Sequence, residues 1–331
     1  MKLFRTALVA AAVAVLALTG CSASGAGDTG SGSSSASSAG TFPQTVKTAF
    51  GDVTVKSEPK RIVALGWGDA ETVLALGGQP VGASDWLAFG GDGVGPWAKG
   101  LYKKSPKIIG TLEPSYEAIA ALKPDLILDV KGSGDKGRHD RLASIATTVS
   151  IPKGGESYLT TMEQQVHMIS TALGVPAKGD KLLDDVDAQY AAVEKAHPEW
   201  KGLTATAATK TSEGWGAYAE GGGRVETLEH FGFTQSPTIA ALPVSSNGFS
   251  VDISSEQLDL LNADLIVAFP IFIDAKEITE DPQWKALKTV QSGHAVVIDG
   301  DLSSAFSTGT TLSTGYTIDN LVPLIDKALK K

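Results

Sequence analysis

Two stretches of the chain repeat the same pattern of apolar and polar positions. In residues 117–128, and again in residues 256–267, a glutamate opens the pattern, a leucine follows five positions later and an aspartate eight positions later. Each aspartate precedes an uninterrupted apolar run, at 126–128 in the first copy and at 265–267 in the second. Because these runs do not alternate with polar residues, they are typical of parallel strands buried on both faces. Each copy therefore predicts a short helix followed by a parallel strand.

A second pair of matching stretches precedes the first pair in the chain. Residues 70–77 and 225–232 share a Glu-Thr pair and end in glycine, so each predicts a helix closed by a glycine cap. A Gly-Trp-Gly sequence precedes both, at 66–68 and at 214–216, although at unequal distances. Three matches in the same order indicate an internal repeat and two lobes of similar construction.

The other apolar runs extend this alternation of strands and helices. The predicted strands are 61–65, 107–109 and 125–130 in the first lobe, and 203–209, 264–269 and 295–298 in the second. Strands that alternate with helices of about ten residues form parallel, right-handed βαβ units. Residues 46–55 contain a Phe-Gly-Asp turn and predict a small hairpin. The predicted fold class is α/β, with two similar lobes that each hold a mostly parallel sheet flanked by helices.

A long amphipathic helix is predicted between the lobes, from residue 179 to residue 197, with Pro198 closing it. Its apolar stripe has helical spacing and consists of Leu183, Val186, Tyr190, Val193 and His197. The helix would be about 28 Å long, which is enough to bridge two lobes and predicts a modest closing motion. The predicted domains are a lobe at 41–178, the helix at 179–198 and a lobe at 199–331.

The first forty residues are predicted to lie outside the fold. Lys2 and Arg5 precede an apolar run too short to span a bilayer, as in a signal peptide that occupies residues 1–20. Cys21 follows Leu-Thr-Gly, which resembles a bacterial lipoprotein box, and it is the only cysteine of the chain. We therefore expect lipid attachment at Cys21 and a flexible Ser/Gly-rich linker over residues 21–40. A plain signal peptide with a chance cysteine is the alternative.

Charge and cysteine content narrow the possible functions. The formal net charge is −9, and removal of the two leader cations would make it −11. An acidic protein outside the cell is a poor nucleic-acid binder. A single cysteine argues against an internal disulfide, thiol redox chemistry and cysteine-ligated metal.

Three phrases of the sequence together resemble the iron-siderophore and cobalamin class of substrate-binding lipoproteins. They are Pro-Lys-Arg-Ile-Val-Ala-Leu at 59–65, Leu-Ala-Leu-Gly-Gly-Gln-Pro-Val-Gly-Ala at 74–83, and the run from Glu117 to Lys-Pro-Asp-Leu-Ile at 123–127. The resemblance extends from about residue 46 to the C-terminus, although the second lobe has Asn-Ala where the first has Lys-Pro. It implies a monomeric, lipid-anchored binding component of an ABC uptake transporter, on the outer face of the cytoplasmic membrane, that delivers an Fe(III)-siderophore to a permease dimer.

The resemblance also implies a docking role for two glutamates. Proteins of this class present one surface carboxylate per lobe to arginine pockets of the permease, and the repeat places Glu117 and Glu256 at those positions. Carboxylate–guanidinium pairs fix register and steer docking. Both glutamates also suit a helix N-terminus, where the dipole favours acids, so a purely structural role stays open.

The ligand is expected beyond the carboxyl ends of the parallel strands, where Gly-rich loops carry aromatic and basic side chains. The candidate ligand-binding residues are Trp67, Trp86, Lys131, Arg138, Trp215, Tyr218, Arg224 and Phe272. Aromatic rings give contact area at low entropic cost, and the cations would neutralise an anionic ferric chelate. The structural alternatives are packing beneath the loop for each tryptophan, and a solvated polar loop for Lys131 and Arg138.

Other functions have weaker support in the sequence. The histidines contain no pair with metal-ligand spacing, which argues against direct metal binding; they are His139, His167, His197, His230 and His294. Haem, through Tyr218 or His139, and cobalamin stay open as alternative ligands. No nucleophile elbow or phosphate loop is present, so no enzyme is expected and no cofactor is implied. A surface adhesion or signalling module on the same scaffold is the remaining alternative, and the chemical class of the siderophore stays open.

Overall fold

A hairpin and a parallel sheet form the first lobe in the computed structural model, which describes residues 40–246 and 248–330. The hairpin pairs β1 (Gln44–Thr48) with β2 (Gly51–Val55), as predicted. The sheet has the order β5-β4-β3-β6-β7, and all its pairs are parallel. Its strands are β3 (Ile62–Ala64), β4 (Pro80–Ser84), β5 (Lys107–Ile109), β6 (Leu126–Leu128) and β7 (Thr147–Val149).

Most helices of the first lobe lie between these strands along the chain, and α4 follows the last of them. They are α1 (Asp69–Ala75), η1 (Pro96–Ala98), α2 (Tyr116–Ala121), α3 (Lys136–Ala143) and α4 (Met162–Ala172). The strand residues of β3 and β6 are all buried, as their unbroken apolar runs predict. β4 and β7 were not among the predicted strands because they contain proline, glycine or threonine in place of an unbroken apolar run.

The second lobe contains a mixed sheet of six strands. Its main order is β11-β9-β8-β12-β13, and β10 also pairs with β8. β8, β12 and β13 are parallel, whereas β9 is antiparallel to both β8 and β11. The strands are β8 (Thr204–Thr211), β9 (Gly214–Tyr218), β10 (Thr234–Gln235), β11 (Ser250–Ile253), β12 (Leu265–Pro270) and β13 (Ala295–Val297). The prediction of a mostly parallel sheet thus holds for the first lobe and only for part of the second.

Short helices connect the strands of the second lobe, and two longer ones end the chain. They are α6 (Gly223–His230), α7 (Pro237–Ala240), η3 (Ser255–Leu261), α8 (Lys276–Thr279), α9 (Pro282–Ala286), α10 (Lys288–Gln291), α11 (Gly300–Thr308) and α12 (Thr311–Leu329). α1 and α6 are the predicted matching helices. The glycines that follow them, Gly77 and Gly232, have φ values of 88° and 101°, a left-handed conformation that favours glycine at a helix end.

The repeated aspartate accepts equivalent hydrogen bonds in both lobes. Asp125 accepts hydrogen bonds from the backbone N–H groups of Lys60 (2.8 Å) and Arg61 (2.9 Å) at the start of β3. Asp264 accepts from the backbone N–H and the hydroxyl of Thr204, both at 2.8 Å, at the start of β8. Each aspartate therefore ties its own strand to the first sheet strand of its lobe, which is a structural reason for the repeat.

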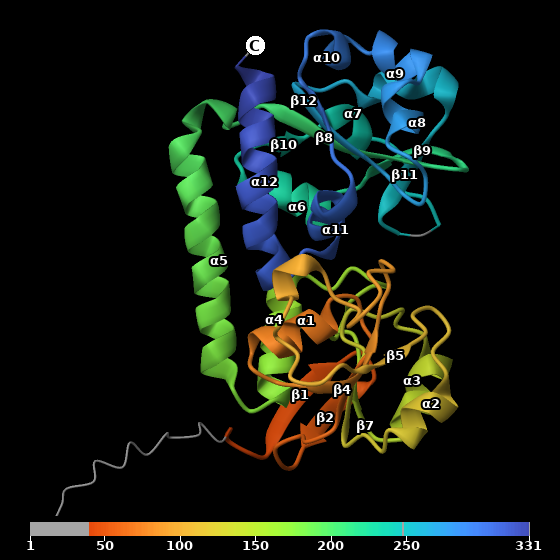
Figure 1. The fold of residues 1–331 in the computed structure, drawn as a ribbon, viewed down its shortest axis with the longest axis vertical. Coiled ribbons are helices and arrows are strands. Elements are labelled where there is room, and N and C mark those ends of the chain that lie inside the picture. The colour runs from red at the N-terminus through yellow and green to blue at the C-terminus, as the bar shows by residue number, and fades with distance from the viewer. Residues whose placement is uncertain (1–39, 247, 331) are drawn as a thin grey trace, which may run out of the picture. The chain divides into compact units, whose positions relative to one another are not determined.

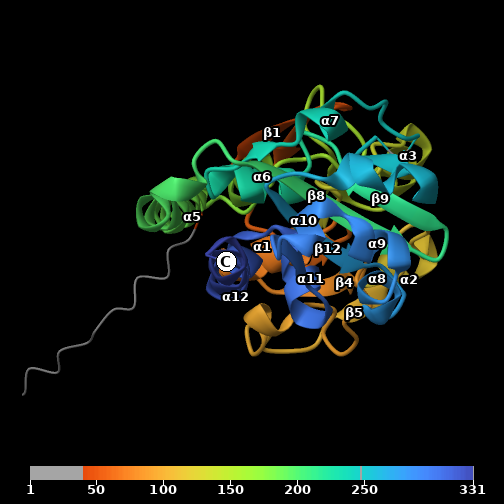
Figure 2. The ribbon, with the colours of Figure 1, turned by 90° about the horizontal axis from the view of Figure 1, so that it is seen from above.

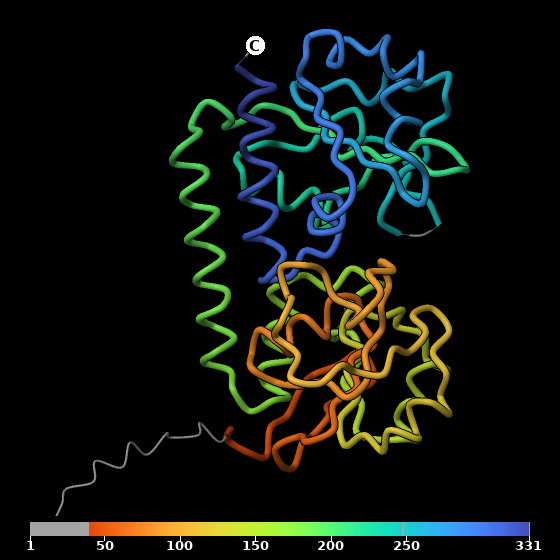
Figure 3. The backbone as a smooth tube through the Cα atoms, in the orientation of Figure 1, coloured from red at the N-terminus to blue at the C-terminus, as the bar shows by residue number. Residues whose placement is uncertain are grey.

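The backbone passes from one lobe to the other along α5 (Pro176–Ala196), which runs beside both of them (Figures 1 and 3). The predicted stripe is confirmed in part, since Val186, Tyr190 and Val193 are buried in the core of the second lobe. Leu182, nearer the start of the helix, packs against a core cluster of the first lobe. At about 1.5 Å per residue the 21-residue helix is about 32 Å long.

A second connection between the lobes comes from the last helix. α12 lies beside α5 (Figure 2), and it also contacts α1 and η1 of the first lobe. Thr310, the N-cap of α12, donates a 2.5 Å hydrogen bond to the carboxylate of Glu71 on α1, and Trp97 Nε1 donates to the same oxygen at 2.8 Å. Burial raises the pKa of Glu71 above its ordinary value, against the effect of these hydrogen bonds. The two lobes belong to one compact unit of the chain.

The predictions also concern the membrane and the leader segment. No helix within residues 40–246 and 248–330 has the length and apolar character needed to cross a membrane. The predicted signal peptide, the lipid attachment at Cys21 and most of the Ser/Gly linker lie outside the described residues.

Candidate ligand-binding site

One wall of the site lies at the carboxyl ends of two neighbouring strands of the first-lobe sheet, β3 and β6. β3 and β6 are neighbours, but the chain continues from them toward opposite edges of the sheet, which leaves a crevice beyond their carboxyl ends. Asp69 occupies this crevice and is fully buried. Its Oδ2 accepts hydrogen bonds from the backbone N–H groups of Gly66 (3.1 Å) and Val130 (2.8 Å), so it joins the loop after β3 to the loop after β6.

Glycine is needed at position 66 because of this arrangement. A Cβ there would collide with the Asp69 carboxylate and with the backbone nitrogen of Lys131. The two loops also bond directly, since Trp67 N–H donates to the Lys131 carbonyl at 3.0 Å. Burial raises the pKa of Asp69 to about 6, and its hydrogen bonds to Gln165 and to backbone N–H groups oppose the rise. The loops that carry Trp67 and Lys131 therefore share one buried anchor.

Stacked aromatic rings form the first-lobe side of the site. The ring of Trp67 lies between two others, with centroids 4.4 Å from Trp86 and 4.1 Å from Tyr158. The planes are inclined by only 7° and 20°. Trp67 Nε1 is buried and has no hydrogen-bond partner among the described residues. Within the described chain, this indole N–H therefore remains an unused hydrogen-bond donor beside the stacked rings.

A second aromatic group lines the site from the other lobe. Tyr218 stacks with Phe249 and Phe269, at centroid distances of 6.3 Å and 5.7 Å. The Arg224 guanidinium lies 4.1 Å from the Tyr218 ring centroid and 5.3 Å from that of Phe269. Such cation–π contacts hold the guanidinium in place without neutralising it. Arg224 Nε is buried and also lacks a hydrogen-bond partner among the described residues.

Residues of both lobes surround a single cavity of about 800 Å³. This size falls in the range of small-molecule sites. Trp67, Trp86 and Lys131 line it from the first lobe, and Tyr218, Arg224 and Phe272 from the second. Hydroxyl groups from α11 complete the wall, at Ser303, Ser304, Ser307 and Thr308. Six of the eight candidate residues are therefore brought together around one cavity.

The two cationic residues of the cavity come from opposite lobes. Burial, and after it the positive charge of Arg224, lower the pKa of Lys131 to about 8, although the charges of Glu226 and Asp69 oppose the change. Burial also lowers the pKa of Arg224. Neither side chain forms an ion pair with a carboxylate in the described part of the chain. An anionic group between them would relieve both the desolvation and the mutual repulsion.

The rim of the cavity exposes two large apolar side chains. Phe272 is 84% exposed and has a φ of 55°, an uncommon left-handed conformation for an aromatic residue. Leu112 is 68% exposed and lines the cavity from the first lobe. Apolar groups at a cavity mouth are positioned to cover a ligand.

Arg138 does not line the cavity, contrary to the prediction. It is buried, and its Nε and Nη2 donate to the two Asp129 carboxylate oxygens at 2.9 Å and 2.8 Å. Its Nη1 donates to the carbonyls of Thr111 (3.0 Å) and Leu112 (3.2 Å). Arg138 therefore positions the rim loop and has no donor directed at the cavity.

Trp215 is the second candidate that lies elsewhere. Residues 214–218 are strand β9 and not a cleft loop, so side chains three positions apart point to opposite faces of the sheet. Tyr218 faces the cavity, whereas Trp215 packs into the opposite core, where its ring stacks 5.5 Å from Trp284. The apparent match between Trp67 and Trp215 is thus a match of sequence and not of position. Trp284 is likewise buried.

Three aromatic residues of the cavity were not among the predicted site residues. Tyr158 belongs to an irregular segment after β7 that had no strand or helix signal, although two glycines shortly before it mark a turn. Phe249 precedes the short strand β11, which was not predicted. Phe269 was read as a buried strand residue, and it is both buried and part of the cavity wall.

The two glutamates of the repeat lie outside the cavity, on the surface. Glu117 is exposed in the first turn of α2, and Ser115 caps that helix through a 3.2 Å hydrogen bond from the Ala118 N–H. Glu256 is exposed in the first turn of η3. Exposure at helix starts in both lobes is compatible with docking and with a structural role.

The alternative haem ligands have little support from the geometry. His139 is not among the residues that line the cavity; its ring stacks on Phe50, and its Nδ1 is 2.7 Å from the Ser150 hydroxyl. Tyr218 is 4% exposed and lies beneath the Arg224 guanidinium. Neither side chain is presented as an axial ligand of haem iron.

Comparisons with known proteins agree with this geometry. The sequence profile of the periplasmic binding protein family matches residues 62–302. The probable siderophore-binding lipoprotein YfiY of Bacillus subtilis is 29% identical over 294 residues, which cover 84% of this chain and 86% of YfiY.

Solved structures agree as well. A periplasmic solute-binding protein from Mycobacterium smegmatis superposes with a TM-score of 0.76 at 27% identity, covering 87% of this chain and 99% of the other. SirA of Staphylococcus aureus, in complex with staphyloferrin B, has a TM-score of 0.72 at 27% identity, with 85% and 98% covered.

Proposed function

Since the chain belongs to the periplasmic binding protein family, we propose that it is the extracytoplasmic substrate-binding component of an ABC uptake transporter and that its ligand is a ferric siderophore. Families of this kind bind and release their ligand unchanged, so the chain is a binding protein and not an enzyme. Its function lies in capture and delivery.

The observation that carries the proposal is the pair of cations that face one cavity from the two lobes. Lys131 and Arg224 line the cavity with no carboxylate partner in the described residues. Stacked rings flank both, Trp67 and Trp86 on one side and Tyr218 on the other. An iron chelate offers the complementary surface, because anionic oxygens surround its metal and organic linkers cover the rest. A ligand that contacts both cations also draws the two lobes together.

The cavity gives less support to the alternative ligands. Haem would need an axial histidine or tyrosine, and neither His139 nor Tyr218 is presented to the cavity in that way. An adhesion or signalling module would not need two half-buried cations that line one cavity from opposite lobes. Cobalamin does not require paired cations, whereas the cost of burying Lys131 and Arg224 is recovered by an anionic ligand.

Delivery requires a partner, and we propose that Glu117 and Glu256 are the contacts with the permease. Both carboxylates are exposed, and the sequence repeat gives one to each lobe. A permease dimer offers two equivalent surfaces, so a binding protein with one exposed carboxylate in each lobe can contact both of them in the same way. The proposed lipid on Cys21 would hold the protein at the outer face of the cytoplasmic membrane and raise its effective concentration near that permease.

Intrinsic fluorescence tests the ligand assignment. The full-length protein is titrated with ferric hydroxamate, ferric catecholate and ferric citrate chelates, with the metal-free chelators as controls. Because Trp67 and Trp86 line the cavity, one ferric chelate is expected to quench the emission with a Kd below about 1 µM. Arg224→Gln is expected to weaken that binding at least about tenfold, since a charged hydrogen bond is lost. If the folded protein is not quenched by any of the three chelates, siderophore binding is refuted.

A further inference from the structure

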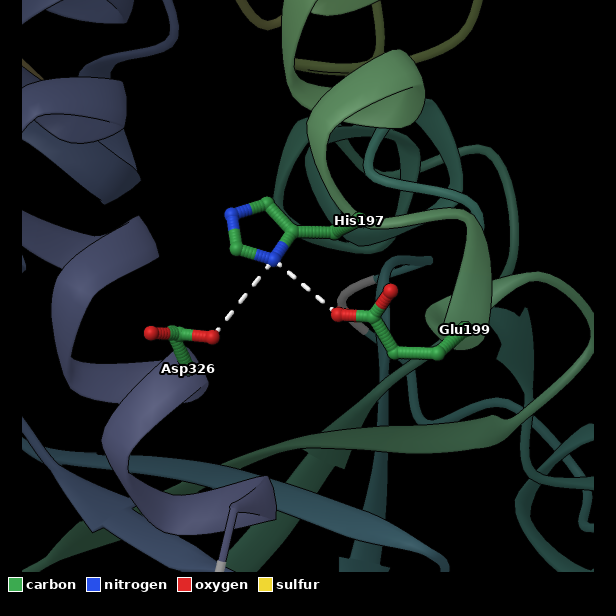
Figure 4. A group of neighbouring side chains, drawn as sticks. All are labelled: His197, Glu199 and Asp326. Atoms are coloured by element: carbon green, nitrogen blue, oxygen red, sulfur yellow. Dashed lines mark hydrogen bonds and ion pairs between the residues drawn. The ribbon is translucent and has the colours of Figure 1, made fainter.

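Three metal-ligating side chains that the proposed function does not use converge where α5 ends. His197 is the C-cap of α5, Glu199 lies in η2 (Pro198–Trp200), and Asp326 lies in the last turns of α12. His197 Nδ1 is 3.2 Å from Glu199 Oε1 and 3.6 Å from Asp326 Oδ1, and the three ligand atoms lie within 4.8 Å of one another. Figure 4 shows both carboxylates turned toward the same ring nitrogen.

The imidazole of this cluster is held in a fixed orientation. Its ring stacks on Trp200 at 3.9 Å, with an interplanar angle of 11°. Trp200 is 1% exposed and belongs to the core of the second lobe. The His197 side chain is only 15% exposed, and its stacking on Trp200 holds the ring with Nδ1 facing the carboxylates. A ligand that is fixed before binding loses little conformational entropy when a metal binds.

One carboxylate oxygen of this cluster has no hydrogen-bond donor among the described residues. Asp326 Oδ1 is buried and has no hydrogen-bond partner in the described part of the chain. The 3.6 Å between it and His197 Nδ1 is too long for a hydrogen bond. The other oxygen, Oδ2, accepts from Lys330 Nζ at 2.7 Å. A buried acceptor without a donor costs free energy, and a bound cation would remove that cost.

We propose that His197, Glu199 and Asp326 bind a divalent first-row transition-metal ion. One imidazole nitrogen with two carboxylate oxygens suits Zn²⁺, Co²⁺ or Mn²⁺, whereas Ca²⁺ and Mg²⁺ prefer oxygen ligands alone and Cu⁺ prefers sulfur. Three protein ligands leave the remaining coordination positions to water. None of the three residues lines the ligand cavity, so this ion would be distinct from the iron of the transported chelate.

The ion would act as a clamp between two helices. His197 and Glu199 follow α5, the helix that joins the lobes, and Asp326 belongs to α12, which reaches from the second lobe to α1. Metal binding would fix the end of the interlobe helix against α12. Sequence reasoning missed the site because it searched for histidine pairs, whereas this set has one histidine and takes its third ligand from the far end of the chain.

His167 provides a matched control within the same protein. It also lies near two carboxylates, with Nε2 3.6 Å from Glu163 Oε1 and Nδ1 3.5 Å from Asp180 Oδ1. Its carboxylates face different ring nitrogens, so the three groups do not converge on one point. If proximity of histidine and carboxylates were sufficient, the two clusters would bind metal equally well.

The test is calorimetric titration of the full-length protein with Zn²⁺, supported by visible absorption after addition of Co²⁺. We expect one saturable Zn²⁺ site, about tenfold weaker or worse in Glu199→Gln and in Asp326→Asn, because each loses a ligand. Glu163→Gln is expected to bind like the wild type. Lys330→Gln is expected to bind Zn²⁺ several times more tightly, since it removes a competing cation from Asp326, and a misfolded protein cannot produce such a gain.

Three results would each overturn the proposal. The first is the absence of a saturable Zn²⁺ site in the folded wild-type protein, and the second is Zn²⁺ binding that persists unchanged in Glu199→Gln and Asp326→Asn. The third is Zn²⁺ binding that Glu163→Gln weakens as much as those two variants do. Zn²⁺ is also expected to raise the midpoint of thermal unfolding of the wild type and not that of Asp326→Asn.

Discussion

The side-chain amide of Gln165 donates a 2.6 Å hydrogen bond to the carboxylate of Asp69, which lies 96 positions earlier in the chain. The same amide donates to the carbonyl of Trp67 at 2.8 Å. One residue of α4 thus fixes both the buried carboxylate under the site and the loop that carries its central aromatic ring. Asp69 in turn binds the loop of Lys131 through the Val130 N–H. The binding loops are therefore held from below before any ligand arrives.

Asp69 should give stability a measurable dependence on pH. Its pKa is raised from 3.8 to about 6 in the fold, so between these values the folded state binds more protons than the unfolded state. The free energy of unfolding should therefore fall as the pH rises from about 4 to about 6, by on the order of 2 kcal/mol, and then stay level. Urea denaturation at a series of pH values measures this step.

Two variants separate Asp69 from other titrating groups. Asp69→Asn cannot ionise, so its difference curve against the wild type should contain the step. Asp52→Asn, at an exposed position of β2, leaves Asp69 in place and should retain the step seen in the wild type. An equal pH slope in the wild type and Asp69→Asn would contradict the assignment.

Lys131 should make ligand affinity depend on pH at the alkaline end. Because its pKa is lowered to about 8, the side chain is charged below that value and loses its charge above it. Affinity for an anionic ferric chelate should be level at neutral pH and fall by up to about tenfold per unit above pH 8. Fluorescence titrations with the ferric chelate between about pH 6.5 and 9.5 measure this change in affinity.

An arginine at the same position serves as the control. Lys131→Arg keeps its charge over the whole range, so its affinity should stay level where that of the wild type falls. Lys136→Gln changes an exposed lysine that pairs with Asp140 on α3, and it should behave like the wild type. If Lys131→Arg loses affinity in parallel with the wild type, the titrating group is the chelate and not Lys131.

Two tryptophans that look equivalent in the sequence should respond differently to substitution. Trp67 lines the cavity, whereas Trp215 packs in the core beside Trp284. Trp67→Leu should remove most of the ligand-dependent quenching and weaken binding by about 1 kcal/mol or more, through the lost ring contacts. Trp215→Leu should leave the affinity unchanged and lower the free energy of unfolding by about 3 kcal/mol. Equal loss of affinity in both variants would contradict the assignment of the cavity wall.

The contrast between these tryptophans shows where the sequence is informative. The buried strands, the glycine-capped helices and the repeat leave strong local patterns, and the structure confirms them. Residues 214–218 have no such pattern, because glycine and alanine weaken the strand signal, and β9 forms through pairing with β8 and β11. Only that pairing reveals that Trp215 and Tyr218 point to opposite faces. Four of the six predicted cavity residues lie in loops after parallel strands, which meet at one edge of a sheet. Tyr218 instead lies in the antiparallel strand β9 and Arg224 in α6.

Arg138 illustrates a second limit of prediction. A basic residue near a Gly-rich loop has the same sequence signature whether it faces a ligand or a neighbouring carboxylate. Asp129, its partner, lies in the same loop region and was itself part of a predicted strand. The choice between solvent, ligand and partner depends on side-chain geometry, which only the fold determines. The convergence of His197 with Asp326 depends on tertiary packing in the same way.

The buried ion pair of Arg138 and Asp129 should matter for stability and only indirectly for binding. Both side chains are nearly inaccessible, at 7% and 5% exposure. Arg138→Leu would leave the Asp129 charge buried without a partner and should cost about 3–5 kcal/mol of unfolding free energy. The double variant Arg138→Leu/Asp129→Leu should lose less than Arg138→Leu alone. A double-mutant cycle in urea measures the coupling, and additive losses would contradict it.

Glu117 and Glu256 should affect delivery and leave capture intact. Both are exposed and neither lines the cavity, so the double variant Glu117→Ala/Glu256→Ala should bind the ferric chelate with wild-type affinity. Loss of two carboxylates that pair with permease cations should reduce cellular uptake of the labelled chelate at least about tenfold. Glu163 and Glu277 are exposed acids in the first turns of α4 and α8, and their double alanine variant should transport normally. Because these control residues also favour helix N-termini, an equal loss of uptake in both double variants would show a structural effect, and normal uptake by Glu117→Ala/Glu256→Ala would refute the docking role.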